Sequence, residues 1–128
     1  MSYAQQYRDV SVLSASPGQL VVMLYDNLLV GLRRTRMAME AGNTELRGQH
    51  LGKCRNIIAE LLSTLDHQKG GEVAANLSAL YAFFLNELLD LGRASDVARL
   101  DRVTGCVQEL RDAFSQIASG GASRAVGA

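Results

Sequence analysis

Apolar residues recur every three or four positions in four successive segments of this chain, and this spacing limits the fold more than any other feature. It is most regular in the last segment, where steps of three and four alternate strictly. The apolar residues there are Leu100, Val103, Val107, Leu110, Phe114 and Ile117. Such spacing puts apolar side chains on one face of an α-helix, whereas a half-buried strand alternates at every second residue. The pattern predicts an all-α fold.

The first helix begins at a recognisable capping signal. Ser16 stands before Pro17 and three positions before Gln19, which makes an S-x-x-Q capping box with proline at the first helical position. Glycine just past the periodic residues favours a C-terminal stop. We therefore expect a helix from about residue 17 to a stop at Gly42.

Three further helices follow, joined by short connections. Asn43 or Thr44 caps the second, and the sequence DHQKGG at 66–71 ends it. The third is expected over about 72–91, before Gly92, and either Ser95 or Asp96 caps the fourth. Connections this short place successive helices side by side in opposite directions. The sequence thus predicts an antiparallel up-down four-helix bundle.

The segments outside the helices differ from them in composition. The stretch SGGASRAVGA at 119–128 has no apolar period and is rich in small residues, which is typical of a flexible, disordered tail. We expect a short N-terminal arm over 1–15, one bundle domain over 16–118 and a tail over 119–128. A chain of 128 residues accommodates a single domain with an ordinary core.

Composition argues against several classes of partner and compartment. Lys plus Arg and Asp plus Glu are balanced at 13 each, so the chain lacks the excess positive charge of a nucleic-acid binder. The N-terminus has no basic segment followed by an apolar one, and no apolar run approaches the ~20 residues that span a bilayer. We expect a cytoplasmic protein without membrane insertion, in which Cys54 and Cys106 are reduced, buried thiols.

Motifs that carry chemistry are missing. His50 and His67 have neither the Glu-x-x-His spacing of di-iron bundles nor a zinc-ligand spacing. Gly70-Gly71 has no phosphate-loop context, and both cysteines occupy apolar helical stripes, which disfavour a reactive thiolate. We therefore expect no enzyme activity, no metal and no cofactor.

The apolar arcs of three helices are wider than a single buried stripe requires. The additional apolar residues are Val21, Val22, Tyr25, Leu29 and Val30 in the first helix, Ile57-Ile58 and Leu61-Leu62 in the second, and Phe83, Leu85 and Leu89 in the third. A short bundle with a broad core face accounts for part of this excess. The other interpretation is a groove that takes an amphipathic segment of another chain.

Four segments in order resemble one known family. SASPGQLVVMLYD, CRNIIAELLSTLD, GGEVAANLSALYAFF and the C-terminal LRDAF look like the FliS-type flagellar export chaperones for flagellin, over about residues 3–117. The resemblance implies a four-helix bundle, sometimes a homodimer, that binds the C-terminal segment of unpolymerised flagellin in the cytoplasm. It also implies that the bundle prevents premature filament assembly and delivers flagellin to the flagellar type III export gate.

The resemblance also suggests positions that contact the flagellin segment. Tyr7, with Tyr3 as a weaker candidate, matches an arm tyrosine that covers part of the binding surface, or else it only packs a loose arm onto the bundle. Asn56 and Asn76 match polar positions that hydrogen-bond the guest, or else they are solvated helix surface. The apolar candidates are Val22, Tyr25, Leu29, Ile57, Leu61, Leu77 and Tyr81. For the last four of these, sequence alone favours plain core over groove lining.

Two positions depart from the family pattern, and two other functions stay open. Asn27 stands where a small residue is common, and Phe114 stands where tryptophan is common. A core-facing Asn27 needs a hydrogen-bond partner. The alternatives are a structural or regulatory bundle that uses the same apolar face for self-association or another client, and a bundle enzyme or metal carrier without recognised ligand spacing.

Overall fold

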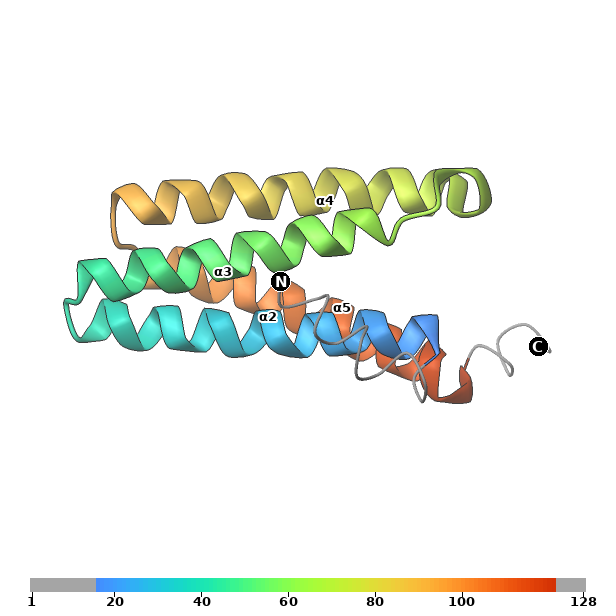
Figure 1. Ribbon diagram of the computed structural model, residues 1–128, viewed down its shortest axis with the longest axis horizontal. Coiled ribbons are helices and arrows are strands. Elements are labelled where there is room, and N and C mark those ends of the chain that lie inside the picture. The colour runs from blue at the N-terminus through green and yellow to red at the C-terminus, as the bar shows by residue number, and fades with distance from the viewer. Residues whose placement is uncertain (1–15, 122–128) are drawn as a thin grey trace.

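The computed structural model describes residues 16–121 and shows four long α-helices, with no strand in that range (Figure 1). The helices are α2 (Pro17–Glu40), α3 (Thr44–Ser63), α4 (His67–Arg93) and α5 (Val97–Gln116), and a π-helical turn, η1 (Ile117–Gly121), follows α5. The predicted arm at 1–15 and residues 122–128 of the predicted tail lie outside the described residues. The all-α prediction is confirmed.

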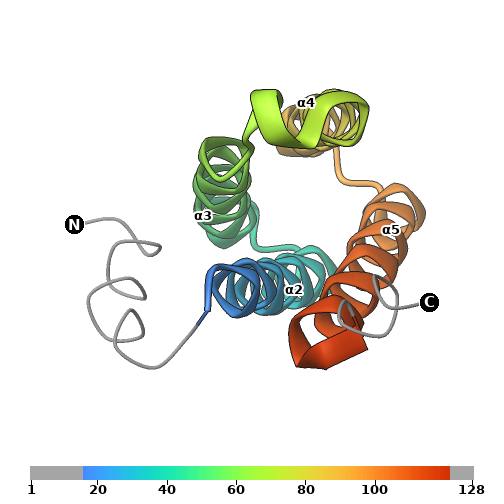
Figure 2. The ribbon, with the colours of Figure 1, turned by 90° about the vertical axis from the view of Figure 1, so that its right-hand side faces the viewer.

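Successive helices run in opposite directions, as the short connections predict (Figure 1). Each helix packs on the next along the chain, and α5 returns to pack on α2. Seen from the end, the four helices stand at the corners of a square, with α2 and α4 on one diagonal (Figure 2). The pair α4 and α5 makes the least extensive backbone contact of the four neighbouring pairs. The molecule is an antiparallel up-down bundle that is closed most loosely between α4 and α5.

Side-chain caps set the beginnings of three helices. Ser16 and Gln19 form the expected box, in which the Gln19 amide donates to Ser16 Oγ at 3.2 Å and the Ser16 amide donates to Gln19 Oε1 at 2.8 Å. Of the candidates left open by the sequence, Asn43 caps α3 and Asp96 caps α5, and each accepts a backbone N–H at 3.0 Å. Each cap satisfies a backbone donor that has no partner inside the helix.

The start of α4 differs from the prediction. The expected break at 66–71 ends earlier, because Asp66 caps a helical turn that begins at His67 by accepting the amides of Gln68 and Lys69 at 3.1 and 3.0 Å. This turn joins the rest of α4 through Gly71, whose φ of 49° interrupts the regular helix. Glycine adopts this conformation without the steric cost that a Cβ adds. The GG pair is thus a kink inside α4 rather than a gap before it.

The wide apolar arc of α2 is explained by its place in the bundle. Tyr25 and Leu29 are buried at 0% and 4% exposure, and Asn27 is buried as well. Because α2 packs against both α3 and α5, its buried arc spans two interfaces. Much of the excess that the sequence shows is therefore core.

Other positions are more exposed than their spacing predicts. Cys54 is buried, but Cys106 is exposed, so the expectation of two buried thiols is wrong for Cys106. Cys106 precedes the buried Val107 by one residue, which rotates it about 100° away from the core stripe. Val73 and Ile117, although in register with the apolar stripes, are 65% and 52% exposed. Both lie near the end of the bundle where α4 starts and α5 ends.

The helical backbone continues beyond the predicted end of the bundle at residue 118. Residues 119–121, which were expected in the tail, continue the helical backbone in η1. Within the range 16–121, none of the helices combines the length and the apolar character that crossing a membrane requires.

Candidate functional site

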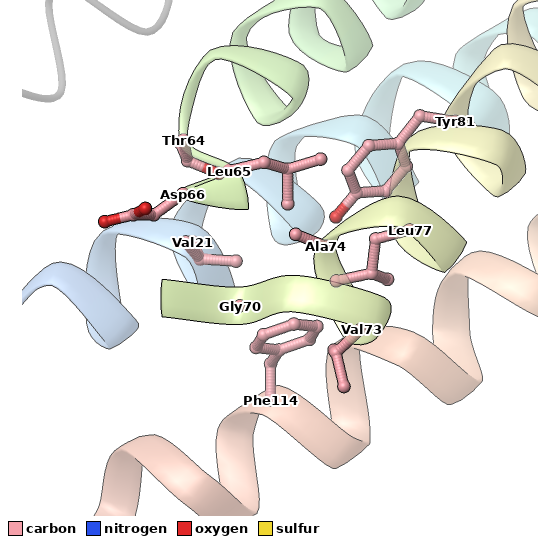
Figure 3. Close-up of a pocket in the computed structure, with 10 residues that line it drawn as sticks. All are labelled: Val21, Thr64, Leu65, Asp66, Gly70, Val73, Ala74, Leu77, Tyr81 and Phe114. Atoms are coloured by element: carbon pink, nitrogen blue, oxygen red, sulfur yellow. The ribbon is translucent and has the colours of Figure 1, made fainter. Parts of the chain in front are cut away.

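An apolar pocket of about 210 Å³ opens where the α3–α4 connection meets α4 and α5 (Figure 3). A dry apolar cavity of roughly 150 Å³ accepts a benzene ring, so this pocket has room for one large apolar side chain. The pocket is lined by Val21 of α2, by Thr64, Leu65 and Asp66 of the connection, by Gly70, Val73, Ala74, Leu77 and Tyr81 of α4, and by Phe114 of α5.

Three aromatic rings form a packed group beside this pocket. The Tyr25 ring centroid lies 6.5 Å from that of Tyr81 and 5.5 Å from that of Phe114, and the two tyrosine hydroxyls form a buried hydrogen bond with each other. Burial raises the pKa of both phenols above the ordinary tyrosine value, most strongly for Tyr25. Both therefore stay neutral at physiological pH, and their hydrogen bond holds α2 against α4.

The pocket wall at the start of α4 is close-packed backbone. A Cβ at Gly70 would lie 2.9 Å from the Cβ of Ala74, so only glycine fits there without a shift of the chain. With the Asp66 cap and the Gly71 kink, this contact folds the first turn of α4 over the pocket. The shape of the pocket therefore depends on the two glycines that the sequence had identified only as a turn.

An apolar strip continues from the pocket along the line between α4 and α5. On α4, Val73, Leu80 and Phe83 recur at helical spacing on one side of the helix, and Phe83 is 50% exposed. That side faces α5, because Glu87, one turn beyond Phe83, accepts from Arg99 at 3.0 Å. We call Val73, Leu80 and Phe83, together with the apolar side chains of α5 that face them, the α4–α5 strip.

On α5, the apolar side chains of the strip also recur at helical spacing on one side of the helix. About two, three and five turns after Arg99, the helix presents Cys106, Leu110 and Ile117 on the face that Arg99 shares, and Phe114 lies beside them. Leu110 and Phe114 are half-buried and pack on the core, while Cys106 and Ile117 are exposed. The α4–α5 strip thus has apolar side chains from both helices, and the Arg99–Glu87 pair lies at one end of it.

A second hollow lies on the other side of the α5 end. It has a volume of about 250 Å³ and is lined by Val22, Met23 and Gln19 of α2, and by Ser115, Ala118 and Ser119 of the α5–η1 segment. The ion pair between Arg111 Nε and Asp26 Oδ1, at 2.7 Å, fixes α5 to α2 beside it. The hollow is the environment of the predicted contact residue Val22.

The structure separates the predicted contact residues into three groups. Tyr25, Leu29, Ile57 and Leu61 are buried in the core, where they contribute to the bundle and not to its surface. Leu77 and Tyr81 line the pocket, and Val22 lines the hollow. Asn56 and Asn76 are exposed. Tyr7 and Tyr3 lie outside the described residues.

Sequence reasoning missed several residues of the pocket and strip as contact candidates. Val73, Leu80, Phe83, Leu65 and Phe114 all belong to apolar patterns in the sequence, but their spacing alone does not separate core from surface. The sequence carries no signal that separates them, because the loose packing of α4 on α5 is a tertiary feature. Val73 at 65% exposure is the clearest example.

The pocket and the α4–α5 strip offer mainly apolar surface. In the part of the chain that the structure describes, no three His, Cys, Asp or Glu side chains gather as a metal site would need. His50 is half-buried and His67 is exposed at the start of α4. Burial raises the pKa of the Cys54 thiol to about 12, which leaves it protonated and unreactive. An apolar pocket joined to an apolar strip is suited to holding a segment of another chain.

Fold and site together define a four-helix bundle with an exposed apolar pocket and strip. The sequence matches the family described as flagellar protein FliS over residues 1–121. It is 38% identical over 117 residues to the flagellar secretion chaperone FliS of Salmonella typhimurium, covering 91% of this chain and 87% of that protein. The chain belongs to the FliS family.

Other relatives give the same result. The flagellar secretion chaperone FliS of Bacillus subtilis is 34% identical over 86% of this chain and 81% of its own length. The flagellar secretion chaperone FliSB of Pseudomonas aeruginosa is 32% identical over 91% of this chain and 96% of its own length. The resemblance found in the sequence is confirmed. The family is one of flagellar export chaperones, and the chain is not an enzyme.

Proposed function

We propose that this protein is a cytoplasmic export chaperone that binds the C-terminal segment of unpolymerised flagellin. By covering that segment it prevents premature filament assembly, and it delivers flagellin to the flagellar type III export apparatus. The observation that carries the proposal is the apolar pocket that continues into the α4–α5 strip.

The physical argument begins with the client. A filament subunit outside the filament leaves an apolar helical face without its partner, and such a segment is disordered or aggregates. A groove lined by apolar side chains from two helices covers that face without any covalent step. Ordering the segment costs roughly 2–5 kcal/mol of the gross interaction energy, so the contact must extend over a large surface. A strip along two helices, with a pocket at one end for an anchoring side chain, meets this requirement.

The test is isothermal calorimetry with a peptide of the C-terminal ~40–50 residues of the flagellin of the same organism, a length that crosses several helices when extended or helical. We expect micromolar or tighter binding with a large negative heat-capacity change. Phe83→Asp, on the strip, should weaken binding by at least about tenfold. Leu89→Asp is the matched control, because it lies on the same helix with a similar exposure, 47% against 50%, but on the side away from the strip.

Three results would contradict the proposal. These are the absence of binding to intact protein, equal affinity of the two variants, or a tight dimer of the protein alone that Phe83→Asp dissociates. The last result would assign the strip to self-association, which is the alternative function. Secretion of flagellin by cells that carry each variant would then test delivery, and Phe83→Asp should reduce it while Leu89→Asp does not.

A further inference from the structure

A second apolar pocket lies at the opposite end of the bundle from the first. It has a volume of about 410 Å³ and lies between the C-terminal end of α2 and the N-terminal end of α3. The α2–α3 connection and the α3–α4 connection stand at the two ends of the long axis, so the two pockets are separated by the length of the bundle (Figure 1). A client held along the α4–α5 strip leaves this second pocket open.

Two apolar side chains that line this pocket are unusually exposed. Met37 is 67% exposed and Leu46 is 38% exposed, and Ala38 lies between them on the floor. Met37 is the most exposed large apolar side chain among the described residues. Methionine is flexible and polarisable, and it is favoured on surfaces that bind apolar side chains. We call this site the hairpin pocket.

The ionisable side chains that line the hairpin pocket are basic. Arg34 and His50 line it, and Lys53 lies one turn beyond His50 on α3. Arg34 and Lys53 both lie close enough to lower the pKa of His50, in addition to the larger effect of burial. Within residues 16–121 neither Arg34 nor Lys53 forms an ion pair. The nearby Glu40 is held by Arg36, which also binds Asp101 of α5 on the other side of α2.

We propose that the hairpin pocket binds an acidic amphipathic helix of a second protein, with apolar side chains entering between Met37 and Leu46 and carboxylates facing Arg34 and Lys53. Two packed helices with an apolar seam between them are the receptor for a helix in the helix-in-groove mode. Two cations beside that seam, neither of them ion-paired within residues 16–121, select acidic partners and repel basic ones. This role goes beyond client binding, because it uses a different end of the molecule.

The experiment uses a designed probe. It is a helical peptide of about 16 residues, or four to five turns, with leucine along one face, glutamate on both flanks and one tryptophan. The protein contains no tryptophan, so the fluorescence of the peptide reports binding directly. A second peptide carries lysine in place of each glutamate. Backbone amide NMR shifts of the labelled full-length protein locate the bound peptide.

Two variants with the same charge change separate the pocket from general electrostatics. Arg34→Glu reverses a charge in the pocket, and Arg33→Glu reverses its exposed neighbour, which points about 100° away around the same helix. We expect the glutamate peptide to bind with shifts centred on Met37 and Leu46. Arg34→Glu should weaken this binding by at least tenfold, about 1.4 kcal/mol, while Arg33→Glu changes it by no more than about twofold. The lysine peptide should bind Arg34→Glu better than the unmodified protein.

Four outcomes would overturn the proposal. They are equal binding of both peptides, equal loss in both variants, shifts centred on the α4–α5 strip, and self-association of the protein that Arg34→Glu abolishes. Flagellin binding, measured in parallel, should be the same for both arginine variants. A failure of the hairpin pocket is therefore distinguishable from a failure of the proposed chaperone function, which Phe83→Asp tests at the other site.

Discussion

At the scale of single residues, the site depends on buried polar groups that satisfy one another. Tyr25 and Tyr81 are 0% and 1% exposed, and their hydroxyls share one hydrogen bond. A buried hydroxyl without a partner is costly, whereas the pair together costs little. The bond therefore fixes Tyr81 in the wall of the pocket.

Replacing both tyrosines should cost less stability than the sum of the two single replacements. Tyr25→Phe or Tyr81→Phe leaves one buried hydroxyl unpaired and should lower the free energy of unfolding by about 1–3 kcal/mol. The double variant should lose clearly less than the sum of the two, as a double-mutant cycle by urea unfolding would measure. Additive losses would mean that the two hydroxyls do not interact in solution.

A second prediction at this scale concerns the contact between Gly31 and Cys54. A Cβ at position 31 would lie 2.7 Å from Cys54 Sγ, which is fully buried. Gly31→Ala should therefore destabilise the protein by about 1–3 kcal/mol through overpacking, although alanine is the better helix former. In a Cys54→Ala background the same change should stabilise by up to about 1 kcal/mol. Thermal or urea unfolding of the four proteins decides this, and an effect of the same sign in both backgrounds would refute it.

At the scale of elements, α4 is the helix whose form depends most on one backbone position. Its first turn is capped by Asp66 and then redirected at Gly71. The redirected turn brings Gly70 and Val73 to the pocket. The geometry of the candidate site is thus decided where the helix departs from regularity.

Gly71→Ala should cost about 1–2 kcal/mol of stability, because φ of 49° is unfavourable for a residue with a Cβ. Gly105→Ala is the matched control, since it lies inside regular α5 with nothing within 4 Å of the new Cβ, and it should stabilise by up to about 1 kcal/mol. Circular-dichroism melts of both variants provide the comparison. If Gly71→Ala were as stable as Gly105→Ala, the kink would not be a feature of the folded protein in solution.

At the scale of the whole molecule, the most extensive helix packing and the proposed binding surface lie in different parts of the bundle. The packing of α2 on α3 is the most extensive, and that of α4 on α5 is the least. Regions with few packed neighbours open locally at a lower free energy than the core. The side of the bundle that is easiest to open is the side that carries the pocket and the strip.

Hydrogen exchange should reproduce this division. Amides at the start of α4, residues 67–74, should exchange faster than those at the centres of α2 and α3. Adding the flagellin segment should slow exchange at the start of α4 and at the end of α5, with little change at the α2–α3 end. Mass spectrometry of the intact chain, with and without the peptide, measures both. Uniform protection before and after addition would contradict the division.

The sequence by itself determined the helices and their order. The periodic apolar residues, the Ser16 capping box and the stop at Gly42 are local features that neighbouring residues reveal. For the caps of α3 and α5 the sequence left two candidates each, and the structure selects Asn43 and Asp96. Short connections then gave the antiparallel bundle. The resemblance of four segments to one family likewise needed only the order of residues.

The tertiary structure decided which apolar residues are core and which are surface. Ile57 and Val73 both fit a helical apolar stripe, yet Ile57 is 3% exposed and Val73 is 65% exposed. Periodicity gives the direction of a side chain around its own helix, but burial depends on how closely a neighbouring helix approaches. Between α2 and α3 that approach is close, and between α4 and α5 it is not. The pocket and the strip therefore follow from distances between helices, which no single segment of the sequence contains.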